Sequence, residues 1–162
     1  MNMNLHNLLQ GLKENKLKFR LLDTKTTMIS SRDVEKVFDG NPREIWKTLV
    51  LTDEKNFYAA FLCGRDRLNL HKLEKVFGVN GLRLAKAKEL KEKFKIQPGE
   101  VCPLTINIPI VCDYSIRDFE KVNFGSGDMM YGIEMKVDDI LKFLGIELMD
   151  IRDSGDEPEQ NS

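Results

Sequence analysis

The chain has 162 residues, of which 41% are hydrophobic and 31% charged, and its formal net charge is −1. These values are typical of one globular domain with its own core, and no apolar run reaches the length of a membrane span. The first residues have neither the basic start nor the apolar block of a signal peptide, so we expect a cytoplasmic protein without a membrane partner.

Acidic residues are concentrated at the end of the chain. Residues 150–162 carry a net charge of −4, which leaves the rest of the chain at +3. We therefore predict a domain over 1–151 and an acidic, disordered tail over 152–162. The mildly basic domain is compatible with a polyanionic partner.

Three cysteines and two histidines are present. They form no CxxC pair and complete no familiar zinc pattern, so we predict neither a metal site nor a cofactor.

Helices and strands alternate along the chain without a regular βαβ rhythm. Apolar periodicity and capping residues predict helices at 5–12, 30–38, 70–77, 86–95 and 137–144. The helix at 30–38 is expected to bury Val34, Val37 and Phe38. β-branched and alternating runs predict strands at 19–22, 46–52, 57–63, 82–85, 106–111, 122–124 and 131–137. The second and third form an antiparallel hairpin, and the whole predicts an α+β domain with a mixed, mostly antiparallel sheet flanked by helices.

Three local features are candidates for chemistry, because no GxSxG, HExxH or Walker pattern is present. Lys47 interrupts the apolar strand at 46–52; it is either a solvated lysine or a lysine at the mouth of a cleft that pairs with a phosphate or carboxylate. The Pro/Gly-rich loop at 98–103 either connects two elements or lines a pocket with main-chain groups. The turn Gly125-Ser126-Gly127-Asp128 is either a hairpin turn or an anion site.

Two further segments have simpler interpretations. The lysines of 86–95 alternate with Glu89 and Glu92, which is typical of a solvated helix face, although a phosphate-contacting surface stays open. Gly64-Arg65-Asp66-Arg67 is most simply a charged turn.

Taken in order, these features resemble the YbaK/prolyl-tRNA-synthetase-associated family of tRNA-editing domains. The resemblance covers residues 30–145. It rests on the Lys-Thr-Leu-Val strand at 47–50, the helix start at Leu68-Asn69-Leu70, the GxxxP loop matched by Gly99 and Pro103, the glycine-bearing turn, and the Asp-Asp-Ile-Leu start of the last helix.

The resemblance implies an editing fold that hydrolyses the ester of mischarged tRNA, of the Cys-tRNA(Pro) or Ala-tRNA(Pro) type. Its partners would be aminoacyl-tRNA and prolyl-tRNA synthetase. Lys47 would hold the terminal nucleotide and act in catalysis together with Ser126 and Gly127. The implied aminoacyl pocket comprises Gly99, Glu100, Val101, Cys102, Pro103, Gly125, Asp128 and an acidic residue matched by Glu134.

Two other functions stay open. The first is a non-catalytic module of the same fold that binds tRNA or a synthetase; an open cavity beside Lys47 would favour the enzyme and a filled one the module. The second is an unrelated hydrolase that uses Cys102 as its nucleophile.

Overall fold

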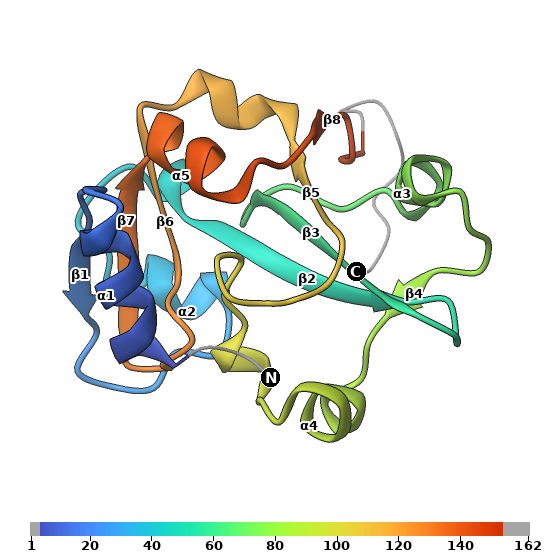
Figure 1. Cartoon of the computed structure of the whole chain (residues 1–162), viewed down its shortest axis with the longest axis horizontal. Helices are drawn as coiled ribbons and strands as arrows, with labels where there is room; N and C mark the ends of the chain where they lie inside the picture. The colour runs from blue at the N-terminus through green and yellow to red at the C-terminus, as the bar shows by residue number, and fades with distance from the viewer. Residues whose placement is uncertain (1–3, 154–162) are drawn as a thin grey trace.

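The computed structural model describes residues 4–153 (Figure 1). Within them the helices are α1 Leu5–Glu14, α2 Ser31–Glu35, α3 Leu70–Phe77, α4 Ala87–Phe94 and α5 Val137–Leu144, with short 3-10 helices at Pro42–Glu44, Pro98–Glu100 and Tyr114–Asp118. The strands are β1 Arg20–Asp23, β2 Trp46–Thr52, β3 Phe57–Cys63, β4 Arg83–Leu84, β5 Ile110–Asp113, β6 Lys121–Gly125, β7 Tyr131–Lys136 and β8 Leu148–Met149. No helix in this range is long and apolar enough to cross a membrane.

The strands form two sheets. The smaller has the order β1-β7-β6 and is antiparallel throughout. The larger has the order β4-β2-β3-β5-β8, antiparallel from β4 to β3 and parallel from β3 to β8. In Figure 1 the smaller sheet stands at the left, with α3 at the right and α4 below. These sheets and their flanking helices confirm the predicted mixed-sheet α+β fold.

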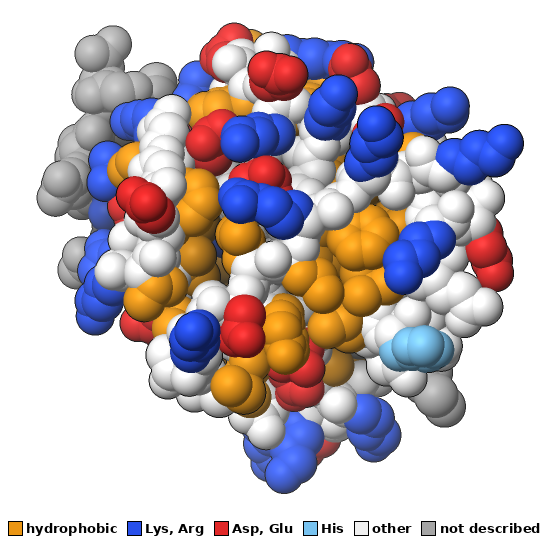
Figure 2. All heavy atoms as spheres, turned by 90° about the vertical axis from the view of Figure 1, so that its left-hand side faces the viewer, with side chains coloured by type: hydrophobic (Ala, Val, Ile, Leu, Met, Phe, Trp, Pro, Cys, Tyr) orange, Lys and Arg blue, Asp and Glu red, His pale blue; other side chains and the backbone are white. Residues whose placement is uncertain are grey.

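The core lies where α1 covers the smaller sheet and the start of the larger one. Leu8 and Leu12 of α1 are fully buried, in one cluster with Trp46 and Phe61. The ring centroids of these two aromatic residues are 5.3 Å apart. A second cluster, around Leu73 of α3, covers the larger sheet elsewhere. The outer face beside α1 and β1 shows apolar side chains in its middle with charged ones around them (Figure 2).

One edge of β2 is left partly unpaired. β2 pairs with β3 over its whole length, but with β4 only through its last two residues. The Ala85 N–H donates to the Val50 carbonyl at 2.9 Å, which shows that Val50 faces the β4 side. Alternate residues of an antiparallel strand turn both main-chain groups the same way, so Thr48 also faces that side. A parallel bridge between Ile45 and Asn123 joins the two sheets just before this stretch.

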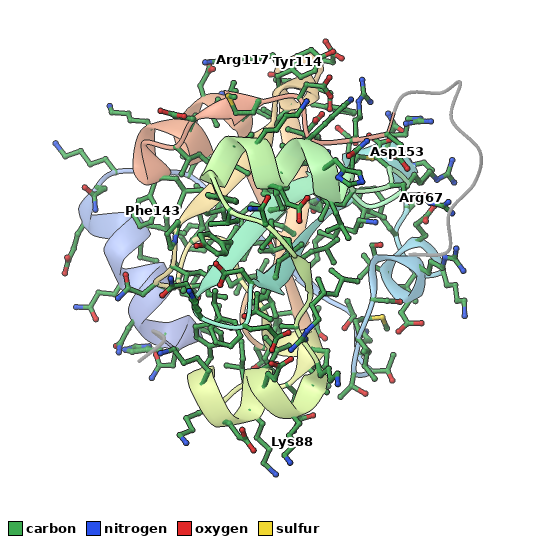
Figure 3. The ribbon with its side chains drawn as sticks, turned by 90° about the vertical axis from the view of Figure 1, so that its right-hand side faces the viewer. Arg67, Lys88, Tyr114, Arg117, Phe143 and Asp153 are labelled. Atoms are coloured by element: carbon green, nitrogen blue, oxygen red, sulfur yellow. The ribbon has the colours of Figure 1, made fainter. Side chains whose placement is uncertain are left out.

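The helix predicted at 30–38 is shorter and buries none of its residues. α2 ends at Glu35, and its start is capped as expected, by the Ser30 hydroxyl and the Asp33 carboxylate. The prediction of a buried stripe was wrong: Val37 is 51% exposed. Figure 3 shows the reason, since α1 and α2 lie on opposite sides of the sheets and α2 does not pack on the α1 core.

The strand predicted at 106–111 begins only at Ile110. The Cys102 carbonyl accepts from the N–H groups of Thr105 and Ile106, which closes a turn where extended chain was expected. Pro109, which has no N–H to donate, then precedes β5. β-branched composition therefore predicted the strand but not its start.

The chain continues in ordered contacts past residue 151. Arg152 forms an antiparallel bridge with Leu68, and the Asp153 N–H donates to the Arg67 carbonyl at 2.9 Å. The first two residues assigned to the acidic tail thus pair with the segment before α3. The rest of that predicted tail, 154–162, lies outside the described residues.

Candidate active site

A cavity of about 1060 Å³ lies along the partly unpaired edge of β2. Its wall includes β2 residues from Trp46 to Val50, and α2 with the chain on either side of it. The loop around Gly99, the β6–β7 turn and the segment 64–67 contribute further, and β1 and the chain from Leu84 into α4 complete it. The cavity is large enough for a nucleotide-sized ligand with an attached small group, since pockets for drug-sized ligands hold about 300–1,000 Å³.

Lys47 is held in this wall by two main-chain oxygens. Its Nζ donates to the Asp66 carbonyl at 2.8 Å and to the Gly64 carbonyl at 3.2 Å. An ammonium group has three N–H donors, so a third is available to a ligand. Burial lowers the pKa of Lys47; among charged neighbours, Asp66 opposes this shift and Arg32 and Arg67 add to it. The structure therefore places Lys47 beside a cavity, which is the position that the second of the two sequence interpretations predicts.

The surroundings of Lys47 favour an anion. Arg32 and Arg67 both line the cavity. The nearby Asp66 carboxylate is already engaged, by Arg152 at 3.1 Å and Arg43 at 3.8 Å. Arg67 lies on the same side of the molecule as α2 in Figure 3. Because other arginines neutralise the Asp66 carboxylate, the positive charges of Lys47, Arg32 and Arg67 can attract a phosphate or carboxylate ligand.

Buried polar groups without partners are concentrated at the cavity. Within residues 4–153, the buried side-chain nitrogen and oxygen atoms that lack a hydrogen bond are Trp46 Nε1, Thr48 Oγ1, Arg67 Nη1 and the two amide atoms of Asn123. All four residues line the cavity. Each of these atoms is itself buried, although buried polar groups normally have a partner.

Two glycines bring the loops of the wall together. A Cβ atom at Gly125 would lie 2.8 Å from the Val101 carbonyl oxygen, and one at Gly99 would lie 2.6 Å from that of Met28. Real Cβ atoms essentially never come this close to another heavy atom. The close approach of these loops therefore depends on the absence of a side chain at both positions.

The structure divides the predicted site residues into two sets. Those that line the cavity are Lys47, Gly99, Val101, Gly125 and Asp128. Those outside its lining are Glu100, Cys102, Pro103, Ser126, Gly127 and Glu134. Gly127, in the second set, adopts a φ of +93° in the turn between Gly125 and Asp128, a conformation that glycine adopts without strain.

The side chains of Ser126 and Cys102 are buried in the fold, away from the cavity lining. The Ser126 hydroxyl donates to the Tyr131 carbonyl at 2.6 Å and accepts from the Asp128 N–H at 3.2 Å, so it holds the turn closed. Burial raises the pKa of the Cys102 thiol to about 11, which disfavours the nucleophilic thiolate.

Glu134 lies in an ion pair of the smaller sheet. Its carboxylate contacts Arg20 at 3.0 Å and Lys121 at 3.6 Å. Burial works to raise the pKa of Glu134, but the hydrogen bond from Arg20 and the two positive charges outweigh it, and the net pKa is lowered. The carboxylate is therefore ionised and paired, and it lies behind Arg20, which lines the cavity.

Sequence reasoning missed the role of the segment 64–67. It was interpreted as a charged turn, yet its carbonyls hold Lys47. The available signal was the hairpin itself, because pairing Trp46 with Cys63 puts the residues after β3 beside the start of β2. No group of three or more potential metal ligands occurs among the described residues.

Part of the chain is similar to curated proline–tRNA ligases. The chain is 31% identical over 103 residues to a proline–tRNA ligase of Sulfurihydrogenibium sp. (strain YO3AOP1), and 33% identical over 103 residues to that of Persephonella marina (strain DSM 14350 / EX-H1). Each match covers 63% of this chain but only 18% of the ligase. The chain thus corresponds to a small part of these curated relatives.

Solved structures share the fold over nearly the whole chain. The hypothetical protein APE2540 has a TM-score of 0.79 at 24% identity, covering 90% of this chain and 99% of that one. A candidate trans-editing enzyme for prolyl tRNA synthetase has a TM-score of 0.77 at 21% identity, covering 95% and 99%. The family model of the aminoacyl-tRNA editing domain matches residues 24–143. These residues include β2, the loops at 98–101 and 125–128 and all of the cavity lining except the part from β1, and the chain therefore belongs to the aminoacyl-tRNA editing domain family.

Proposed function

We propose that this protein is a cytoplasmic trans-editing deacylase, which hydrolyses the ester between a wrong amino acid and tRNA. The observation that carries the proposal is the open cavity beside Lys47. Its wall combines a cation with a spare N–H, the four arginines Arg20, Arg32, Arg65 and Arg67, and loops that approach closely at glycines. Such a wall suits a substrate with a phosphate at one end and a small acyl group at the other.

Lys47 would bind the phosphate of the terminal nucleotide. The ammonium is fixed by two carbonyl oxygens before the ligand arrives, so little side-chain freedom is lost on binding. The ribose would then lie toward the loops around Gly99 and Gly125, with the aminoacyl group in the cavity. Positioning of this kind supplies much of the rate of a reaction on an already activated ester.

The chemical step needs no nucleophilic side chain. A water, oriented by the neighbouring ribose hydroxyl, attacks the ester carbonyl, and the developing oxyanion accepts hydrogen bonds from main-chain N–H groups of the cavity wall. The proton that the water loses passes to the ribose oxygen as its bond to the carbonyl carbon breaks. Collapse of the intermediate returns the ribose hydroxyl and releases the amino acid. Within the proposed site, Ser126 and Gly127 act by holding the turn that presents those groups, and Asp128 lies at the wall itself.

We propose mischarged tRNA(Pro) as the substrate, carrying alanine or cysteine. Support comes from the two similar ligases, which are both proline–tRNA ligases. A synthetase pocket gains only about 1–3 kcal/mol from one methylene, so a proline pocket cannot reject small amino acids well. Prolyl-tRNA synthetase would then be a partner that supplies the mischarged tRNA.

The alternative is a non-catalytic module that binds tRNA or a synthetase through the same fold. The open cavity weighs against it, because a binding module has no need for an open pocket of about 1060 Å³ beside Lys47. The cysteine-dependent hydrolase loses support for the reason given above, the burial of Cys102.

The test is deacylation of a panel of labelled aminoacyl-tRNAs, led by Ala-tRNA(Pro) and Cys-tRNA(Pro). Lys47→Ala should lose turnover while its melting temperature stays close to wild type. Lys88→Ala is the matched control, because this lysine lies on α4 with its side chain 84% exposed. Unchanged turnover in Lys47→Ala would refute the role of Lys47, and no hydrolysis of any ester by wild type, with tRNA still bound, would favour the non-catalytic module.

A further inference from the structure

The segment that holds Lys47 is itself held by the end of the described chain. Residues 150–153 run beside 66–69 in an antiparallel arrangement, with the Leu68–Arg152 bridge at its centre. The Asn69 N–H donates to the Ile151 carbonyl at 2.8 Å, and the Asp153 N–H donates to the Arg67 carbonyl at 2.9 Å. Figure 3 shows Arg67 and Asp153 close together on one side of the molecule. Residues 151–153 lie outside residues 24–143, the part that matches the family model, whereas their partners 67–69 lie inside it.

The Arg152 side chain joins this segment to the interior. Its Nη1 contacts the Asp66 carboxylate at 3.1 Å, and its Nε lies 3.7 Å from the carboxylate of Asp113. Asp113 is fully buried at the end of β5 and accepts from the Ile151 N–H at 3.1 Å. Lys72 of α3 further fixes the strand by donating to the Arg152 carbonyl at 2.8 Å. Arg152 is therefore held by Asp113 and Lys72, and its guanidinium group in turn binds the Asp66 carboxylate.

Asp66 has two contacts that matter here. Its main-chain oxygen accepts the shorter of the two hydrogen bonds from Lys47, while its carboxylate is held by Arg152. Arg43 is the second cation near this carboxylate, but at 3.8 Å and with its side chain 55% exposed it constrains Asp66 less. Movement of Asp66 would change both the direction of the Lys47 side chain and the charge beside it.

We propose that Arg152 is a positioning residue for the editing site: through Asp66, it fixes the main-chain carbonyls that hold the Lys47 ammonium. It touches neither substrate nor reacting atoms, and its effect on turnover rests on the function proposed above. The consequence for the domain is that residues 150–153 form a working part of the site.

The experiment compares Arg152→Met, Arg152→Lys and Asp66→Asn with Arg117→Ala as the control. Arg117 makes an exposed ion pair with Asp138 and has no contact with this segment. The first measurement is the rate at which an amine-acylating reagent labels Lys47, relative to the exposed Lys88, followed by mass spectrometry. The reagent should label Lys47 faster in Arg152→Met and in Asp66→Asn than in wild type. Labelling in Arg152→Lys should be slower than in Arg152→Met. In Arg117→Ala the labelling rate should equal that of wild type.

The second measurement is deacylation by the same variants, alone and combined with Lys47→Ala. Displacing a positioned group costs up to about a hundredfold in rate, so Arg152→Met should lower kcat/KM by about ten- to a hundredfold. Added to Lys47→Ala, it should cause little further loss, whereas a general structural defect would lower the rate in both backgrounds.

An unchanged labelling rate of Lys47 in the folded variants would overturn the proposal, as would equal losses with and without Lys47. If Arg152→Met does not fold, Asp66→Asn and Arg152→Lys give the same test with smaller changes. If wild type hydrolyses no ester, the proposed function fails, while the labelling rates still decide whether Arg152 positions Lys47.

Discussion

Gly125→Ala tests whether the two loops of the cavity wall need to touch. The added Cβ atom would meet the Val101 carbonyl oxygen at 2.8 Å, whereas ordinary contact begins at 3.4 Å, so the loops must separate by at least about 0.6 Å. Overpacking of this kind costs about 1–3 kcal/mol, offset by about 0.4–1 kcal/mol from the lower entropy of the unfolded chain. We expect a net destabilisation of about 0.5–2.5 kcal/mol.

Gly11→Ala is the matched control. Gly11 lies inside α1, and a Cβ atom there would meet nothing within 4 Å. The same substitution should therefore stabilise the protein by about 0.5–1 kcal/mol through helix propensity. For a chain of this size 1 kcal/mol shifts Tm by about 2–4 °C, so thermal denaturation should move the two variants in opposite directions.

Activity gives the second part of the same test. Val101 lines the cavity, so moving it displaces the main chain around the acyl group, and Gly125→Ala should lose about tenfold in deacylation rate. Gly11→Ala should keep wild-type activity. Equal stability and equal activity in the two variants would refute the argument that loop contact shapes the cavity.

Three further results are expected. Raising the pH from about 7 to 10 should weaken binding of a non-hydrolysable aminoacyl-tRNA analogue. Burial lowers the pKa of Lys47 below 10.5, so the ammonium loses its proton at a lower pH than a free lysine does. In Lys47→Met the binding should be weak and should not change over this pH range. Cys102→Ser should leave deacylation near wild type, since burial raises the pKa of that thiol to about 11; abolished activity would restore the cysteine mechanism. Hydrogen bonds from Arg83 lower the pKa of Glu89 to about 2 from 4.5. The stability that they add is complete above pH 4.5 and is lost as the pH falls toward 2. In Glu89→Gln the free energy of unfolding should therefore fall less over this pH range than in wild type.

Local patterns predicted most elements because local chemistry determines them. The hairpin of β2 and β3 was placed at the correct residues, since two apolar runs flank a short polar turn. The ends of α3 and α5 were also confirmed: Gly78 and Gly145 cap these helices with φ values of +67° and +58°, a conformation that glycine adopts without strain.

The predictions were wrong or incomplete where contacts between segments far apart in the sequence determine the structure. Periodicity identified an apolar face at Val34 and Val37, but it could not tell whether that face meets a core or a cavity, and both residues line the cavity. Pairing of Arg152 with Leu68 joins segments 84 residues apart through a polar stretch, for which the sequence carries no apolar signal. The Lys47 role was one of two interpretations, and the choice required the position of the carbonyls after β3.

The cavity exists because β4 is short. After Ala85 the chain leaves the edge of β2 and starts α4. There the Glu89 carboxylate accepts from the Lys86 N–H at 2.9 Å and from Arg83 at 2.8 Å. A longer β4 would use the main-chain groups of β2 at Thr48 and fill the space beside Lys47. The Arg83–Glu89 ion pair lies where β4 ends and α4 begins, and beyond this point the edge of β2 at Thr48 has no strand partner among the described residues.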